Sequence, residues 1–345
     1  MFLLRSVQIE DLDNLYELSK MVTFISLPPD RDIIARTIKS SIISFVNPAK
    51  EFAKNHYFFV LEDLQTNKVI GASMIHAQHG TKTEPHFYLT VSSEHKFSKT
   101  INTGFIHGTL KLGLDTNGPT EIGGLVLHPD YRGHPDKLGK KISFVRFLYM
   151  GLYPKRFKKM VHSELMPPLD KTGNSPLWEA IGRRFLNMNY QDADVLSRSN
   201  KEFILSLYPS DTIYETLLPI EARNSIGKVG PDTLPVKKML EAIGFKYNYE
   251  VDPFDGGPHY RCLLKDILPI RQMDLAVVSD EVEFAKENSE KIIINLPSSD
   301  YPFRALFSKA TFDVENRGLI NFSQDFRNYF GIKNGDSGYY IPTSY

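Results

Sequence analysis

Residues 120–147 read TEIGGLVLHPDYRGHPDKLGKKISFVRF, and this stretch carries the strongest indication of the fold. Its first eight residues are typical of a β-strand that ends in a Pro-Asp turn. A loop rich in Arg, Gly and Lys follows, and residues 137–153 then show the apolar spacing of a helix. A strand, a loop and a helix in this order indicate an α/β protein.

The loop and the start of the following helix can together hold a pyrophosphate through their backbone N–H groups. Gly133 and Gly139 would let the backbone approach such a ligand closely. The positive charge would come from Arg132, Lys137, Lys140 and Lys141. The alternative is an ordinary turn with Lys and Arg at its surface. Neither GxxxxGK[ST] nor GxGxxG is present in the sequence, so this is not a Walker loop or a dinucleotide fingerprint.

Outward from this stretch, the same patterns predict further elements. Strands are expected at 2–8, 86–92, 160–165 and 247–252, and a β-hairpin at 57–76 with a Gln-Thr-Asn turn. Helices are expected at 10–21, 31–46, 175–188 and 234–245. Ser175 followed by Pro176 is a strong helix start, because serine is a good N-cap and proline fits the first turn.

The length of 345 residues suggests two domains, at roughly 150 residues per domain. After residue 265, strand-like runs alternate with polar turns. We therefore predict a body over 1–265 and a small, all-β, barrel-like domain over 266–345. A hydrophobic content of 41% and an aromatic content of 12% are enough for a sizeable core and argue against wholesale disorder.

Charge and cysteine content exclude several classes of protein. Lys plus Arg and Asp plus Glu both number 41, and this zero balance argues against a nucleic-acid binder. Cys262 is the single cysteine, so an intrachain disulfide is impossible and a structural zinc cluster is not expected. No histidine pair has HxxxH spacing, and no metal is expected. Without an apolar run of about 18 residues or a secretory signal, we predict a cytoplasmic enzyme that acts on a small molecule.

The strand, loop and helix at 120–147 resemble motif A of the GNAT superfamily of CoA-dependent N-acyltransferases. The resemblance implies a GNAT-like α/β fold with a mixed central sheet that splays open around acyl-CoA. In that family the strand backbone binds the pantetheine and the loop binds the pyrophosphate. The cofactor-binding residues implied here are Leu125, Val126, Leu127, Arg132, Gly133, Gly139 and Lys140.

A more specific resemblance covers about residues 1–265 and, weakly, the C-terminal segment. The blocks SPLWEAIGRRFLNMNYQDADVLS (175–197), TIYETLLPIEARNSIGKV (212–229) and MLEAIGFKYNYEVDPFDGGP (239–258) are similar, in this order, to the arginine N-succinyltransferase family. The resemblance implies transfer of succinyl from succinyl-CoA to the α-amine of L-arginine, in arginine degradation, by direct attack of the amine on the thioester. It also implies a homodimer or a larger assembly, and Leu125 as the residue whose backbone contacts succinyl-CoA.

The sequence departs from this family at three places. Gly230 stands where the family block IGQVH has its proton-donor histidine, and Met166 replaces the arginine of the block AEMRG. Residues 22–26 replace a Gly-rich approach to TSLP. Two alternatives therefore stay open: a related acyl-CoA transferase with a different amine acceptor or acyl donor, and a catalytically weak relative that binds CoA.

Two carboxylates are candidate catalytic residues. Glu121 begins the motif-A strand and is either the general base or a solvated carboxylate at a strand edge. Glu164 keeps the family's carboxylate and either binds a cationic group of the acceptor or forms a structural ion pair. Backbone N–H groups near Leu125 and Val126 could stabilise the oxyanion.

The remaining candidates have simpler alternatives. Asp255 is either a substrate-binding residue or part of a turn, since its segment reads Asp-Pro-Phe-Asp-Gly-Gly-Pro. Ser175 is either a weak substrate-binding candidate or a helix cap. His128, His134 and His259 lie nearest the predicted site in the sequence, and each is either a replacement for the missing family histidine or an ordinary hydrogen-bonded histidine.

Overall fold

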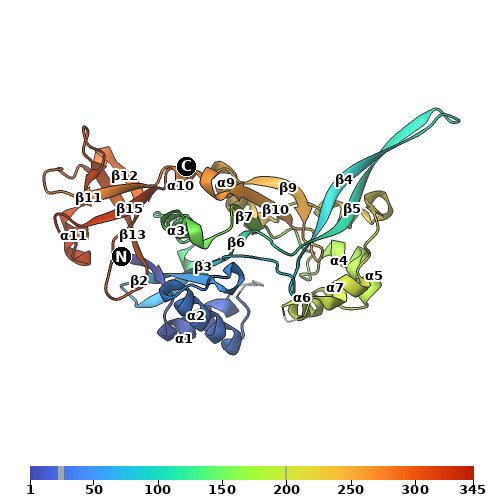
Figure 1. Cartoon of the computed structure of the whole chain (residues 1–345), viewed down its shortest axis with the longest axis horizontal. Coiled ribbons are helices and arrows are strands. Elements are labelled where there is room, and N and C mark those ends of the chain that lie inside the picture. Colours follow the sequence, from blue (N-terminus) through green and yellow to red (C-terminus); the bar gives the residue numbers. More distant parts are fainter. Residues whose placement is uncertain (22–26, 199) are drawn as a thin grey trace. The chain divides into compact units, whose positions relative to one another are not determined.

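The computed structural model describes residues 1–21, 27–198 and 200–345, which form two compact units (Figure 1). Unit 1 comprises Met1–Ala77, Thr120–Lys159 and Leu263–Tyr345, and unit 2 comprises Gln78–Pro119 and Met160–Cys262. The predicted domain boundary at residue 265 stays a prediction, and residues 266–345 pack in the same unit as the N-terminal residues. The departure at 22–26 lies outside the described residues.

Unit 1 is built on strands in the order β12-β15-β11-β14-β13-β1-β2-β3-β6. Neighbours pair antiparallel, except that β11 and β14 are parallel. The strands are β1 (Phe2–Ser6), β2 (His56–Asp63), β3 (Lys68–His76), β6 (Thr120–Leu127), β11 (Asp274–Val278), β12 (Ser289–Asn295), β13 (Arg304–Phe312), β14 (Leu319–Asn321) and β15 (Ser337–Pro342). The predicted hairpin at 57–76 and the C-terminal strands are therefore present.

The helices of unit 1 are α1 (Leu12–Lys20), α2 (Arg31–Val46), α3 (Leu138–Leu152), α10 (Leu268–Arg271) and α11 (Gln324–Phe330). Figure 1 shows α1 and α2 on one side of β2 and β3 and α3 on the other. Alternate residues of β3 confirm this arrangement: Ala72 and Met74 pack with the α1 and α2 core, whereas Ser73 Oγ donates to Ile142 O of α3 at 2.7 Å. Because both faces are covered, β2 is an almost continuous apolar run.

The motif-A strand β6 carries a β-bulge. Ala72 pairs with Val126 and Met74 pairs with Gly123, so Gly124 and Leu125 together lie opposite one residue of β3. Gly124 has φ +56°, a left-handed conformation that glycine adopts without strain. The bulge therefore falls at Leu125, the position at which the family resemblance implies contact with the acyl-CoA.

Unit 2 has strands in the order β7-β10-β9-β4-β5-β8. They are β4 (His86–Ser98), β5 (Thr103–Asp115), β7 (Met160–Glu164), β8 (Ile213–Tyr214), β9 (Lys246–Val251) and β10 (Pro258–Leu263). The helices are α4 (Pro176–Ala180), α5 (Gly182–Leu186), α6 (Tyr190–Ser197), α7 (Glu202–Leu207), α8 (Ile220–Ser225) and α9 (Leu234–Ala242).

The prediction of a single helix over 175–188 is wrong, because this segment forms two short helices, α4 and α5. The predicted start is confirmed: Ser175 Oγ accepts a hydrogen bond from the backbone N of Trp178 at 3.0 Å. The buried Trp178 ring occupies the space beside Gly182, where a Cβ would lie 2.2 Å from Trp178 Cε3. Residue 182 must therefore stay small, and the core of unit 2 forms around this indole.

The structure has strands that the sequence pattern missed, chiefly β5. β4 and β5 pair antiparallel along their whole length of 13 residues each and form a long hairpin (Figure 1). Among the described residues, no helix is both long enough and apolar enough to span a membrane.

Candidate functional site

The predicted cofactor-binding residues of unit 1 lie on one continuous strand, loop and helix. Arg132 and Gly133 are exposed, and no atom lies within 4 Å of a Cβ built on Gly133, which has φ +75°. Lys137 is the N-cap residue of α3. It has φ 53°, and its side chain makes no capping hydrogen bond. Gly139 is likewise open, because the nearest atom to its added Cβ is 3.8 Å away on Leu127. The backbone of this loop is accessible to a ligand.

Two of the predicted basic residues are instead packed against the C-terminal segment. Lys140 Nζ donates to Tyr345 O at 3.1 Å, and burial lowers its pKa. The buried Lys141 donates to Thr343 Oγ1 at 2.8 Å, and burial lowers its pKa to about 8. The exposed positive charge of the loop is therefore that of Arg132 and of Lys137.

Glu121 belongs to a row of titratable side chains across three neighbouring strands of unit 1. It pairs in register with His76 of β3, which in turn pairs with His56 of β2. The two imidazole Nδ1 atoms are 2.6 Å apart, so one ring must donate a proton and the other must accept it. Burial and the neighbouring His76 lower the pKa of His56 to about 4, while the charge of Glu121 acts to raise it. Sequence reasoning missed both histidines, since strand pairing is what brings them to Glu121.

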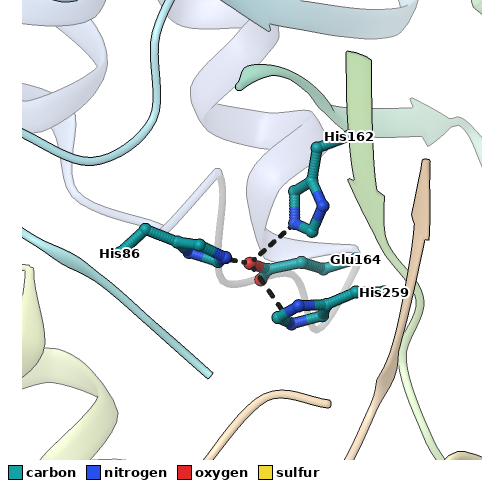
Figure 2. Close-up of side chains that lie close together, drawn as sticks. All are labelled: His86, His162, Glu164 and His259. Carbon is teal, nitrogen blue, oxygen red and sulfur yellow. Dashed lines mark hydrogen bonds and ion pairs between the residues drawn. The ribbon is translucent and has the colours of Figure 1, made fainter. Parts of the chain in front are cut away.

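A compact cluster of titratable side chains lies in unit 2, around Glu164. Figure 2 shows the imidazoles of His86, His162 and His259 pointing toward the Glu164 carboxylate. Oε1 of Glu164 is 3.3 Å from Nε2 of His162 and 3.7 Å from Nδ1 of His86. It is also 3.7 Å from Nε2 of His259. His86 is 2% exposed, His162 and His259 are fully buried, and the Glu164 side chain is 32% exposed.

The strands explain this convergence. His162 and Glu164 are two residues apart on β7 and so lie on one face of it. His259 is on β10, the neighbour of β7, and His86 is the first residue of β4. Burial and the charges of the surrounding histidines hold the pKa of His86 well below its usual value. Glu164 and His259 were predicted from the sequence as candidate site residues, whereas His86 and His162 were not.

Arg261 and Glu250 form a second layer of charged side chains next to the histidines of this cluster. Arg261 NH2 lies 2.6 Å from Glu250 Oε2 in an ion pair, and Arg261 Nε donates to Nδ1 of His162 at 3.3 Å. Glu250 Oε2 is also 3.7 Å from Nδ1 of His259.

Asp255 lies in a turn, as one of its two alternatives predicted. Asp252 Oδ1 accepts from the backbone N of Phe254 at 2.7 Å and of Asp255 at 3.0 Å, and Asp255 Oδ1 accepts from Gly257 N at 2.7 Å. Burial, followed by the charge of Glu164, raises the pKa of Asp252 to about 7. Burial and the charge of Asp252 raise the pKa of Asp255 well above its usual value. A substrate-binding role for Asp255 stays a prediction.

Gly230 and the segment after β7 contact each other, so two departures from the family motifs coincide in space. Gly230 N donates to Met166 O at 2.8 Å, and a Cβ on Gly230 would lie 2.8 Å from Pro167 O. Residue 230 therefore has no room for a side chain beside this backbone.

His128 and His134 have local roles in unit 1. Their Nδ1 atoms accept hydrogen bonds at 3.2 Å from the backbone N of Asp130 and of Asp136, respectively. These contacts shape the loop between β6 and α3.

A family model and several proteins of known function match this chain over most of its length. A family model described as arginine N-succinyltransferase beta subunit matches residues 2–269. The arginine N-succinyltransferase of Yersinia enterocolitica is 33% identical over 299 residues, 86% of each chain. That of Yersinia pseudotuberculosis serotype O:3 is 31% identical over 344 residues, 98% of this chain and 96% of the relative.

Among solved structures, arginine/ornithine succinyltransferase subunit AI from Pseudomonas aeruginosa superposes with a TM-score of 0.84 at 25% identity, covering 100% of this chain and 99% of that one. The chain therefore shares the α/β fold of this succinyltransferase over its whole length. The chain belongs to the arginine N-succinyltransferase family, and it is an acyltransferase.

Proposed function

We propose that this chain transfers succinyl from succinyl-CoA to the α-amine of L-arginine, in arginine degradation. The observation that carries the proposal is the family match over residues 2–269, with near-full-length relatives named for this reaction. The amine nitrogen attacks the thioester carbonyl carbon, and the C–N bond forms as the C–S bond breaks. The amine proton passes to a base, and CoA leaves as the thiolate, which is a tolerable leaving group because a thiol has a pKa of about 8.5.

For the cofactor, we propose that the bulged strand β6 and the loop after it bind acyl-CoA. Leu125, Val126 and Leu127 would contact the pantetheine through their backbone. The open backbone at Gly133 and Gly139 and the exposed charge of Arg132 support a pyrophosphate site next to the start of α3. Lys140 would join the site once its contact with Tyr345 O opens.

For the base, we propose Glu121, supported by the row of His56 and His76 beside it. A carboxylate next to two imidazoles has a route along which an accepted proton can move away. The sequence-based role of Glu164 in holding a cationic acceptor remains a prediction. Its Oε1 already has three imidazoles around it.

A related transferase with another amine acceptor is the second candidate. The observation that favours it is Gly230, which stands at the family's proton-donor position and packs against the backbone of Pro167. General-acid help is typically worth about 10²–10⁴-fold, so its loss at this position permits a slow enzyme or requires another donor.

The test is thiol release from succinyl-CoA with L-arginine, with L-ornithine and with no amine. We expect release that depends on arginine. Arg132→Ala should weaken CoA binding about 10- to 100-fold, because a charge-assisted contact to phosphate contributes about 1.5–3 kcal/mol. Arg36→Ala, which removes an exposed arginine of α2, is the matched control and should leave binding unchanged. Release with another amine but not with arginine favours the second candidate, and CoA binding without release favours a silent relative.

We also propose that the chain acts in the cytoplasm and assembles as a homodimer. Support for the assembly comes from large apolar side chains that unit 2 exposes on the β4–β5 hairpin, at Phe97, Ile101, Phe105 and Ile106.

A further inference from the structure

The cluster around Glu164 combines three buried imidazoles with one carboxylate. One ligand atom from each of His86, His162, Glu164 and His259 lies within 4.8 Å of the other three. The four side chains come from β4, β7 and β10 and converge on one point (Figure 2). None of them is needed by the proposed cofactor site, which is in unit 1.

Burial makes this arrangement costly as it stands. Nε2 of His86 and both ring nitrogens of His259 are buried without a hydrogen-bond partner. A buried polar atom that has lost its water and gained no partner destabilises the fold. Of these three atoms, Nε2 of His259 is the one that faces Glu164 Oε1, whereas His86 faces it with Nδ1. Nε2 of His259 therefore suits a ligand that a nitrogen lone pair can bind.

We propose that His86, His162, His259 and Glu164 form a binding site for a divalent transition-metal ion of the zinc type. Three imidazole nitrogens and one carboxylate oxygen suit Zn²⁺ and its neighbours, and four protein ligands are the usual number at a structural zinc site. Tetrahedral bonds of about 2.0–2.2 Å place ligand atoms roughly 3.3 Å apart. The observed separations of 3.3 and 3.7 Å from Glu164 Oε1 are close to that value.

Of the two second-layer residues, Glu250 favours metal binding by His259, whereas Arg261 disfavours metal binding by His162. Metal-binding histidines usually donate their other N–H to a carboxylate, and Glu250 Oε2 lies 3.7 Å from Nδ1 of His259. Arg261 has the opposite effect. Its Nε donates to Nδ1 of His162, which places the His162 proton on Nε2, the atom that would bind the metal. Binding at His162 therefore requires this hydrogen bond to break, so Arg261 should limit the affinity of the site.

Metal binding is tested on the full chain after removal of metal with a chelator. The chain is titrated with ZnCl₂ and CoCl₂, and bound metal is measured by elemental analysis after desalting. We expect one equivalent per chain, a Co²⁺ absorption spectrum of tetrahedral type, and a melting temperature raised by several degrees. His259→Gln and Glu164→Gln should each weaken binding at least about 10-fold, whereas His95→Gln, at an exposed histidine of β4, should not.

Arg261→Gln gives a second test, because it should tighten metal binding if Arg261 competes as described. Circular dichroism of each metal-free variant checks that it is folded, and the cobalt spectrum of the unaltered chain needs no variant. The proposal is overturned if the unaltered chain binds no stoichiometric metal at micromolar concentration, or if His259→Gln and His95→Gln bind alike. Thiol release from succinyl-CoA is measured separately, so failure of the metal site is distinguishable from failure of the proposed reaction.

Discussion

At the scale of single residues, Gly230 and its neighbours explain how a family position can change without loss of the fold. The motif comparison pairs His with Gly at 230 and Gly with Pro at 167. The structure places these two positions against each other, with a Cβ on residue 230 only 2.8 Å from Pro167 O. The path of the 166–167 backbone therefore leaves no room for a side chain at residue 230.

We therefore expect Gly230→His to destabilise the chain by about 1–3 kcal/mol, the usual cost of overpacking, without raising turnover. Thermal unfolding and thiol release measure the two effects. Gly230→Ala is the matched control, since it adds the same Cβ without an imidazole and should lower the melting temperature similarly.

The double variant Pro167→Gly/Gly230→His should recover part of that stability, because glycine lets the 166–167 backbone move away. A fully stable Gly230→His single variant would mean that the segment yields easily and that the contact is not a constraint.

Residue-scale prediction from sequence worked where the signal is local. The Ser175 cap depends on a hydrogen bond to Trp178, three residues away, and it was predictable from the order Ser-Pro. The cluster of His86, His162 and His259 was not, because no spacing within the sequence links β4, β7 and β10. Only strand pairing and the packing of unit 2 bring these rings to Glu164.

At the scale of elements, the β4–β5 hairpin departs most from what the sequence pattern predicts. The outer half of the hairpin is exposed on both faces, so it lacks the apolar–polar alternation by which a half-buried strand is recognised. Gly104, Gly108 and Gly113 further weaken the signal in β5. By contrast, α2 is buried along one side and most residues of α3 are buried. The ranges of both helices were predicted closely.

The same hairpin carries a prediction about assembly. Phe97 and Ile106 lie on one face of it, since His95 pairs with Ile106 and Phe97 follows two residues later. They are 65% and 66% exposed. If this face joins two copies, the double variant Phe97→Ser/Ile106→Ser should convert a dimer to a monomer in light scattering.

Val314→Ser is the control for that experiment, because it removes an exposed apolar side chain from unit 1. An unaltered chain that is monomeric at high micromolar concentration contradicts the proposed homodimer. A dimer that survives the double variant places the interface elsewhere.

At the scale of the whole molecule, the zero net charge includes buried carboxyl groups whose ionisation destabilises the folded state. Burial raises the pKa of Asp252 to about 7, against an ordinary value of 3.8. A carboxyl group whose pKa is raised by folding binds its proton more tightly in the folded state. Its contribution to stability is therefore full below about pH 4 and is lost as the pH rises through about 7.

We expect Asp252→Asn to flatten the loss of stability between about pH 4 and pH 7, because asparagine keeps an acceptor oxygen for the turn and has no proton to release. Denaturant unfolding at several pH values measures this, with a slope of up to about 1.4 kcal/mol per pH unit for one proton. Asp211→Asn, at an exposed site in unit 2, should leave the profile unchanged. Equal profiles for all three chains would mean that Asp252 does not titrate in this range.

Whole-molecule organisation was only partly predictable. The α/β body could be recognised from the strand, loop and helix at 120–147, since those signals are contiguous. The return of residues 263–345 to the N-terminal unit could not, because it depends on β13 pairing with β1. The alternation of strand-like runs and polar turns after residue 265 predicts strands, but it does not indicate which earlier strand each of them will pair with.

That pairing has a consequence for the order in which the chain is made. β1 lies between β2 and β13, and its partners on β13 are Arg304 and Ala305. During synthesis from the N-terminus, one edge of β1 stays open while all of unit 2 and the rest of unit 1 up to β13 are added. Open strand edges favour pairing with other chains. One edge of β1 is therefore available for pairing with another chain until β13 has been synthesised.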